Sequence, residues 1–227
     1  MNIHTNQVRA LFLSLLSIFP ATFSHANQLQ NFLEFSLAAQ NQTSTLAFTT
    51  NTYKTKINQL GINWYEPFTQ YFHGGLELGY IEMSQADNTL SSARFTSGEY
   101  AGLLLRFIPL ESEALSLRLN LNYRHSRTIG KNTDQDTQFA WNEALFISEL
   151  EYRPVHNIGL ILAVEYQALN GEQRDSGTIS KITEFTESEQ QSYRFGVHFT
   201  SNRTGVIGIE GFTGFKTGTR LYFLRKF

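Results

Sequence analysis

Apolar and polar residues alternate along most of this chain from Asn31 onward. In the stretch 115–123, the odd-numbered positions are Leu or Tyr, whereas the even-numbered positions between them are Ser, Arg or Asn. The stretches 160–167 and 192–199 show a similar alternation. Because successive side chains of a β-strand point to opposite faces of a sheet, this period of two predicts strands with one apolar and one polar face.

Ten segments of the chain follow this pattern, and we predict an all-β, antiparallel, up-and-down barrel. The segments are 31–41, 52–65, 71–82, 97–108, 114–127, 139–152, 157–168, 190–200, 205–212 and 217–227. The alternation is weak in 205–212, and eight strands are the alternative if this segment is not one of them. Lys54 and Lys56 share the face of an apolar run in the second segment. We expect either a β-bulge there or two lysines above an apolar band.

The connections between the segments alternate between short and long. Short ones fall near 66–70, 109–113, 153–156 and 201–204, and longer ones at 42–51, 83–96, 128–138 and 169–189, with a short last one near 213–216. Membrane barrels of bacteria have short periplasmic turns and longer extracellular loops in this order. The four aspartates (Asp87, Asp134, Asp136 and Asp175) all fall in predicted external loops. A transmembrane barrel is therefore predicted, because a closed barrel leaves no backbone group unpaired in lipid.

Aromatic residues near the segment ends predict two belts at the membrane interfaces. One belt would consist of Trp64, Tyr65, Phe107, Tyr152, Phe199 and Phe227, and the other of Tyr80, Tyr100, Tyr123, Trp141, Tyr166 and Tyr193. A water-soluble β-sandwich would instead concentrate its aromatics in its core.

The amino terminus has the features of a secretory signal peptide. Arg9 supplies a positive charge, and the apolar run 11–19 is too short for a membrane helix, which needs about 20 residues. Small residues before Asn27 offer a cleavage site after Ala26. We therefore expect a signal peptide at 1–26 and one barrel domain at 27–227.

The last strand carries a further signal. Leu221, Phe223 and the terminal Phe227 share one face of it. This pattern resembles the C-terminal signature of Gram-negative outer-membrane β-barrel proteins, although Arg225 shares the same face and must reach towards the lipid headgroups. The resemblance implies an outer-membrane location, insertion by the barrel insertion machinery, and contact with outer-membrane lipid and lipopolysaccharide.

Charged residues on the polar face of the segments predict the contents of the barrel. They are Glu34, Glu77, Arg106, Arg118, Arg124, Glu149, Glu151, Glu165, Arg194, Glu210 and Arg220. An isolated buried charge is very costly, so we expect these residues to pair into a plug that crosses the lumen. A narrow pathway for water or small solutes is the alternative. A wide diffusion pore needs about 16 strands and is not expected.

One group of residues suggests enzymatic chemistry at the periplasmic end. His198, Ser201 and Glu210 are similar to the His, Ser and Glu of outer-membrane lipid A deacylases. In that family the Ser follows the His by two positions, where this chain has Thr200. That family also works at the outer leaflet, so we assign no catalytic role here.

A second group lies near the external rim. His125 with Asp134 and Asp136 suggests the omptin-type surface proteases, which are also ten-stranded and use Asp and His. That fold carries longer strands and more acidic rim residues than we expect from 27–227. Two loop carboxylates are also too few for calcium, which takes six to eight oxygens. The sequence predicts no catalytic, cofactor-binding or metal-binding residue.

Composition narrows the remaining function classes. The chain has no cysteine and a net charge of −2, which argues against thiolate chemistry and against nucleic-acid binding. We expect a structural or interaction role, with 169–189 as the loop for any extracellular ligand because it is the longest polar connection. The alternatives are a small-solute channel, a lipid A-modifying or surface enzyme, and a soluble periplasmic β-barrel binder.

Overall fold

The computed structural model describes residues 33–201 and 204–227, so the predicted signal peptide lies outside the described residues. The strands are β1 (Glu34–Phe48), β2 (Thr52–Pro67), β3 (Phe72–Ser84), β4 (Phe95–Glu111), β5 (Leu115–Asn132), β6 (Gln135–Val155), β7 (Ile158–Gly177), β8 (Lys181–Glu187), β9 (Gln191–Thr200), β10 (Gly205–Gly214) and β11 (Lys216–Lys226). A 3₁₀ turn, η1 (Ser91–Ala93), precedes β4. Within the described part of the chain, no helix is long and apolar enough to cross a membrane.

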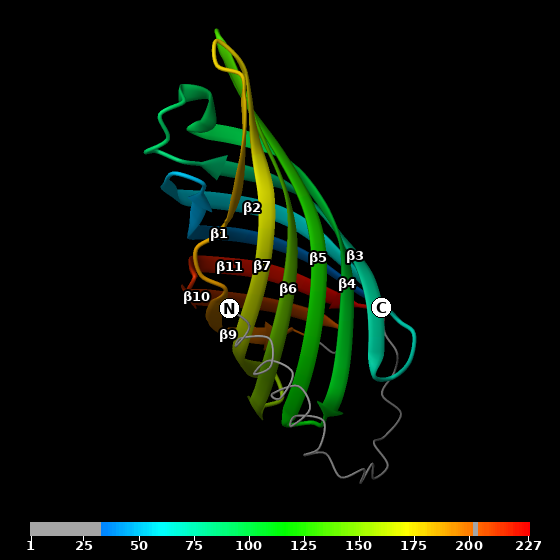
Figure 1. The fold of residues 1–227 in the computed structure, drawn as a ribbon. Helices are drawn as coiled ribbons and strands as arrows, with labels where there is room; N and C mark the ends of the chain where they lie inside the picture. Colours follow the sequence, from blue (N-terminus) through cyan, green and yellow to red (C-terminus); the bar gives the residue numbers. More distant parts are fainter. Residues whose placement is uncertain (1–32, 202–203) are drawn as a thin grey trace, which may run out of the picture.

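The strands close into an antiparallel ring, which confirms the predicted fold class (Figure 1). β1 pairs with β11 from Glu34↔Lys226 to Ser44↔Lys216, and β7 pairs with β9. Ten strands, β1–β7 and β9–β11, therefore surround one lumen. β10, the segment with the weakest alternation, pairs with both β9 and β11. The eight-stranded alternative is therefore wrong for this part of the barrel.

The two ends of the barrel differ. At one end, which we call the turn end, short turns join the strands and the last strand finishes. At the other, the hairpin end, β5, β6 and β7 rise past β9–β11 (Figure 1). There β8 pairs with β7 from Asn170↔Thr186 to Asp175↔Lys181, and with β1 from Leu46↔Glu187 to Phe48↔Phe185. The ten-stranded ring thus continues into a second ring of eight strands, β1–β8, which we call the extension.

Three of the four predicted long loops are largely strand. The stretch 42–51 is mostly β1, 128–138 is the β5–β6 hairpin, and 169–189 is the β7–β8 hairpin. β5, β6 and β7 contain 18, 21 and 20 residues and are longer than predicted. Outside the membrane both faces of a strand tolerate polar residues, so the alternation of polarity fades although the pairing continues. Asp175 accordingly lies in β7 with its side chain buried, and not in a loop.

The outer face of the ring is apolar, whereas the inner face is polar. Leu78, Leu103 and Leu162, for example, are each about 60% exposed, at 61%, 59% and 59%. This arrangement is the reverse of a soluble barrel, which buries apolar side chains and exposes polar ones. We call this outer surface the lipid belt. Its presence contradicts the alternative of a soluble periplasmic binder.

Most of the predicted interface aromatics lie on the outer face. Trp64, Phe107, Tyr152, Phe199, Phe227, Tyr80, Tyr123, Tyr166 and Tyr193 are all exposed. Tyr65, Tyr100 and Trp141 instead point inward, at 5%, 7% and 3% exposure, so their assignment to the belts is wrong. Each shares its face of the strand with inward polar residues; Tyr100, for example, lies six positions before Arg106.

The two lysines of β2 lie on the outer face of the barrel without a bulge. β2 pairs with β1 without interruption from Thr52 to Tyr65. Lys54 and Lys56 are exposed and therefore lie above the lipid belt on the strand that carries Leu60 and Ile62.

Candidate functional site

A layer of charged side chains crosses the middle of the ten-stranded ring. Arg194 of β9 is its centre, with side-chain nitrogens 2.5 Å from Glu149, 3.5 Å from Glu165 and 3.5 Å from Glu210. The Arg194 side chain is 4% exposed. β6, β7 and β10 supply the three carboxylates, so one cation on β9 ties together four neighbouring strands.

Further ion pairs extend this layer towards the hairpin end. Arg124 lies 2.6 Å from Glu143 and 3.8 Å from Glu77. Lys216, at the start of β11, lies 2.5 Å from Glu165. Its position also places the ammonium 4.8 Å from the centre of the Phe212 ring.

The network continues towards the turn end. Arg118 lies 3.1 Å from Glu149 and 2.6 Å from Glu151. Arg153 lies 2.5 Å from Glu151 and 3.2 Å from Glu111.

Two more ion pairs involve Arg106 of β4 and Arg220 of β11. Arg106 binds Glu34 at 2.9 Å and stacks over the ring of Tyr65 at 3.9 Å. Arg220 lies 3.5 Å from Glu210. The structure thus places all eleven lumen residues named from the sequence inside the barrel, each with a partner of opposite charge.

Sequence reasoning missed several members of this network. They are Glu111, Glu143, Arg153, His198 and Lys216. The period of two could have identified Glu143, because it shares its face of β6 with Glu149 and Glu151. Lys216 fell in a predicted turn, and Glu111 and Arg153 lie beside β-bulge or register irregularities near the turn end, where simple alternation fails.

The charged layer borders two cavities. The larger, of about 840 Å³, lies towards the turn end and is lined by Arg118, Glu151 and Arg153 among others. A smaller cavity of about 80 Å³ lies towards the hairpin end beside Arg124 and Lys216. The two cavities adjoin at the level of Arg194, because they share the lining residues Asn63, Asn122, Ile147, Arg194 and Arg220.

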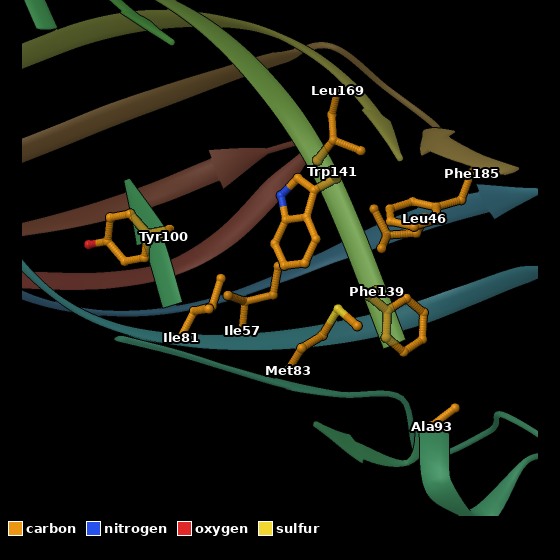
Figure 2. Packing of buried hydrophobic residues seen from close by; sticks show 10 residues of the cluster. All are labelled: Leu46, Ile57, Ile81, Met83, Ala93, Tyr100, Phe139, Trp141, Leu169 and Phe185. Carbon is orange, nitrogen blue, oxygen red and sulfur yellow. The ribbon is translucent and has the colours of Figure 1, made fainter. Parts of the chain in front are cut away.

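Beyond the smaller cavity, apolar side chains fill the extension. The buried cluster, which we call the apolar plug, contains Leu46, Ile57, Ile81, Met83, Ala93, Tyr100, Phe139, Trp141, Leu169 and Phe185 (Figure 2). These residues come from β1, β2, β3, η1, β4, β6, β7 and β8, and none comes from β9–β11. The plug thus belongs to the eight-stranded ring.

Phe185 connects the walls of the plug. Its ring centre lies 5.1 Å from that of Phe48, 6.0 Å from Phe139 and 6.4 Å from Trp141. These separations fall in the range of favourable aromatic pairs. β8 therefore joins the walls of the extension through the Phe185 side chain as well as through its backbone pairing with β1 and β7.

Buried polar side chains surround the plug and are hydrogen-bonded among themselves. Thr137 donates to Asp175 at 2.9 Å, and the Gln173 amide donates to the same carboxylate at 2.9 and 3.0 Å. Gln85 donates to Thr55 at 3.0 Å on the opposite wall. Satisfied polar groups of this kind make the extension rigid.

The two residue groups with possible enzymatic chemistry do not assemble into sites. His125 points out of β5 and contacts the Asn142 oxygen at 2.9 Å, while Asp134 and Asp136 are exposed at the tip of the β5–β6 hairpin. In the described part of the chain, no group of three or more His, Cys, Asp or Glu residues is arranged to hold a metal ion.

His198 belongs to the charged network at the turn end. Its Nε2 atom lies 3.2 Å from Glu151, and its Nδ1 atom lies 3.4 Å from the hydroxyl of Tyr222. Ser201 is exposed in the turn that follows β9. The residues of the supposed deacylase pattern therefore serve different parts of the barrel.

The C-terminal residues named from the sequence lie on the last strand, β11, or directly after it. Leu221, Phe223 and Phe227 are exposed on the outer face of the barrel beside β1. The guanidinium of Arg225 lies 5.3 Å from the centre of the Phe227 ring. Recognition of this segment by the insertion machinery stays a prediction.

No protein-family model and no curated protein sequence matches the chain. Solved structures do match. The outer membrane protease OmpT from Escherichia coli aligns with a TM-score of 0.53 and 9% identity, covering 91% of this chain and 100% of that chain. The translocator domain of autotransporter NalP from Neisseria meningitidis aligns with a TM-score of 0.49 and 9% identity, covering 98% and 96%.

The likeness to OmpT shows the fold, which is that of outer-membrane β-barrel proteins. The predicted location in the outer membrane agrees with this fold and with the lipid belt described above.

Proposed function

We propose that this protein is a closed outer-membrane barrel that anchors a rigid extracellular extension for interaction with other molecules. The apolar plug carries the proposal. An ion crossing the lumen would have to leave the charged layer and pass among packed apolar side chains such as Phe139, Trp141 and Phe185, which cannot replace its water of hydration. The turn end would face the periplasm, so the larger cavity is a blind vestibule.

The tip of the extension supports the interaction role. The Gln135 side chain accepts a hydrogen bond from the Ile179 N–H at 2.9 Å and donates to the Ile179 carbonyl at 3.0 Å. The Thr178 N–H donates to the Asp134 carbonyl at 3.0 Å. Two hairpins are thus joined at their ends, and they present Ile179 and Ile182 at 47% and 63% exposure. Such preorganised surfaces bind partners at low entropic cost.

The proposal is tested by recording ion currents through the purified barrel in planar lipid bilayers. We expect the wild type to stay silent at either polarity, and the double variant F139A/F185A to conduct. The matched control L162A/F195A removes comparable apolar volume from the lipid belt, where the two residues face each other across β7 and β9. It should stay silent. Stepwise currents through the wild type would contradict the closed barrel.

Photo-crosslinking in intact cells tests the interaction role. A photo-crosslinking residue at Ile182 should form adducts with a partner in intact cells, whereas one at Thr217, exposed on the outer face of β11, should not. Equal labelling at both positions, or none at Ile182, would count against a binding surface on the extension.

A further inference from the structure

The outer face of β2 changes character along the strand. From the turn end it presents Trp64, Ile62 and Leu60, which belong to the lipid belt, and then Lys56 and Lys54. Because β2 pairs without a bulge on this stretch, the lysines stay on the lipid-facing side of the barrel. Neither lysine has an acidic partner within 4 Å among the described residues.

Hydroxyl groups lie on both sides of these lysines. The strand register places Lys56 between Thr43 of β1 and Ser84 of β3, and Lys54 beside Thr45. Residues opposite each other in a sheet share a face, so two ammonium groups and three hydroxyls occupy one area of the surface. We call this area the lysine patch.

The height of the lysine patch matches the lipid headgroups. Leu60 lies opposite Tyr80, an exposed tyrosine of the kind that marks a membrane interface. Lys56 lies four residues before Leu60 in the chain, which places it about 14 Å further along the strand towards the hairpin end. With a strand tilt of roughly 40°, this is about 10 Å along the membrane normal. Long lysine side chains can reach back towards the interface.

Two exterior arginines, by contrast, contact partners within the protein. Arg174 of β7 lies 2.5 Å from Glu172, and Arg127 of β5 donates to Gln138 at 3.1 Å. Glu82 of β3 accepts a hydrogen bond from Asn58 at 3.4 Å. This pair lies two residues along the strands from Lys56 and Ser84, on the side nearer the lipid belt. The patch thus retains unpaired positive charge directly above an apolar surface.

We propose that the lysine patch binds the phosphates of one lipid A molecule in the outer leaflet, with acyl chains lying along Leu60, Ile62 and Tyr80. Lipid A combines anionic phosphates with acyl chains, and this arrangement matches lysines and hydroxyls placed above an apolar strand face. Hydroxyl and ammonium groups both donate hydrogen bonds to phosphate oxygens. The proposal does not depend on whether the lumen conducts.

The test compares two double variants of the full barrel in detergent micelles, with lipid binding followed by native mass spectrometry. K54Q/K56Q removes both charges of the patch. R127Q/K131Q removes two charges from the outer face of β5 and serves as the control. The lipids are bisphosphorylated lipid A, monophosphorylated lipid A and phosphatidylglycerol. Heat-dependent gel mobility verifies that each variant is folded.

We expect K54Q/K56Q to bind bisphosphorylated lipid A about 30-fold more weakly than the wild type, since each surface lysine contributes about fivefold. The affinity of R127Q/K131Q for the same lipid should stay within about threefold of the wild-type affinity. The affinity for monophosphorylated lipid A should fall less in K54Q/K56Q than the affinity for the bisphosphorylated lipid. Equal losses in both variants would overturn the site. Binding of phosphatidylglycerol as tight as that of lipid A would show diffuse charge attraction instead and would overturn the proposed ligand.

Discussion

The substitution R194M tests whether the charged layer holds the barrel together. Arg194 is 3% exposed and lies between three carboxylates from β6, β7 and β10. Methionine keeps much of the volume but removes the charge. The carboxylates would each retain one cation: Arg118 for Glu149, Lys216 for Glu165 and Arg220 for Glu210.

Breaking a buried ion pair by removing one partner costs about 3–5 kcal/mol, because the remaining charge is buried without compensation. We expect R194M to lose about 3 kcal/mol of unfolding free energy, the lower end of that range, since each carboxylate keeps a second cation. The matched control is R174M. Its pair with Glu172 lies on the surface, at 56% and 33% side-chain exposure, and should contribute less than about 1 kcal/mol.

The measurement is urea unfolding of the barrel in lipid vesicles, followed by tryptophan fluorescence and by gel mobility without boiling. A loss no larger than that of R174M would refute the reasoning and would mean that the network adapts to the missing charge.

Two further substitutions test the faces of the barrel. Gly208 lies under the ring of Tyr222, and an added Cβ would meet its ring and hydroxyl atoms at 2.3–2.5 Å. G208A should therefore cost about 1–3 kcal/mol in the wild type, but should be neutral or stabilising in a Y222A background; equal effects in both would contradict this. Leu78 is 61% exposed in the lipid belt, and L78R should cost about 2–4 kcal/mol. R225L, near the edge of the belt, should change stability by about 1 kcal/mol or less in the same unfolding assay.

The order of apolar and polar residues determined the ten-stranded ring. In the segments that cross the lipid belt, most outward positions are apolar and exposed, and most inward positions are polar or charged. A strand with two such different environments must alternate, so positions such as Leu162 and Glu165 revealed their faces directly. The same alternation indicated the eleven charged residues of the lumen before their partners were known.

Sequence reasoning failed where the environment of the two faces is similar. β8 was missed because 181–187 lies outside the membrane, where Ile182 and Glu184 can both face water. Aromatic residues were ambiguous for a related reason. Tyr100 and Tyr123 are chemically alike, and only the face of the strand decides that the first fills the plug while the second meets lipid.

The plug itself was decided by tertiary structure alone. Leu46, Trp141 and Phe185 are far apart in the chain, and each lies in a short stretch without a distinctive motif. They meet because β8 pairs with both β7 and β1 and reduces the ring from ten strands to eight. That pairing depends on long-range register, for which no local pattern codes. The sequence by itself therefore determined the barrel and its charged interior, and the tertiary structure decided that apolar side chains gather inside the extension.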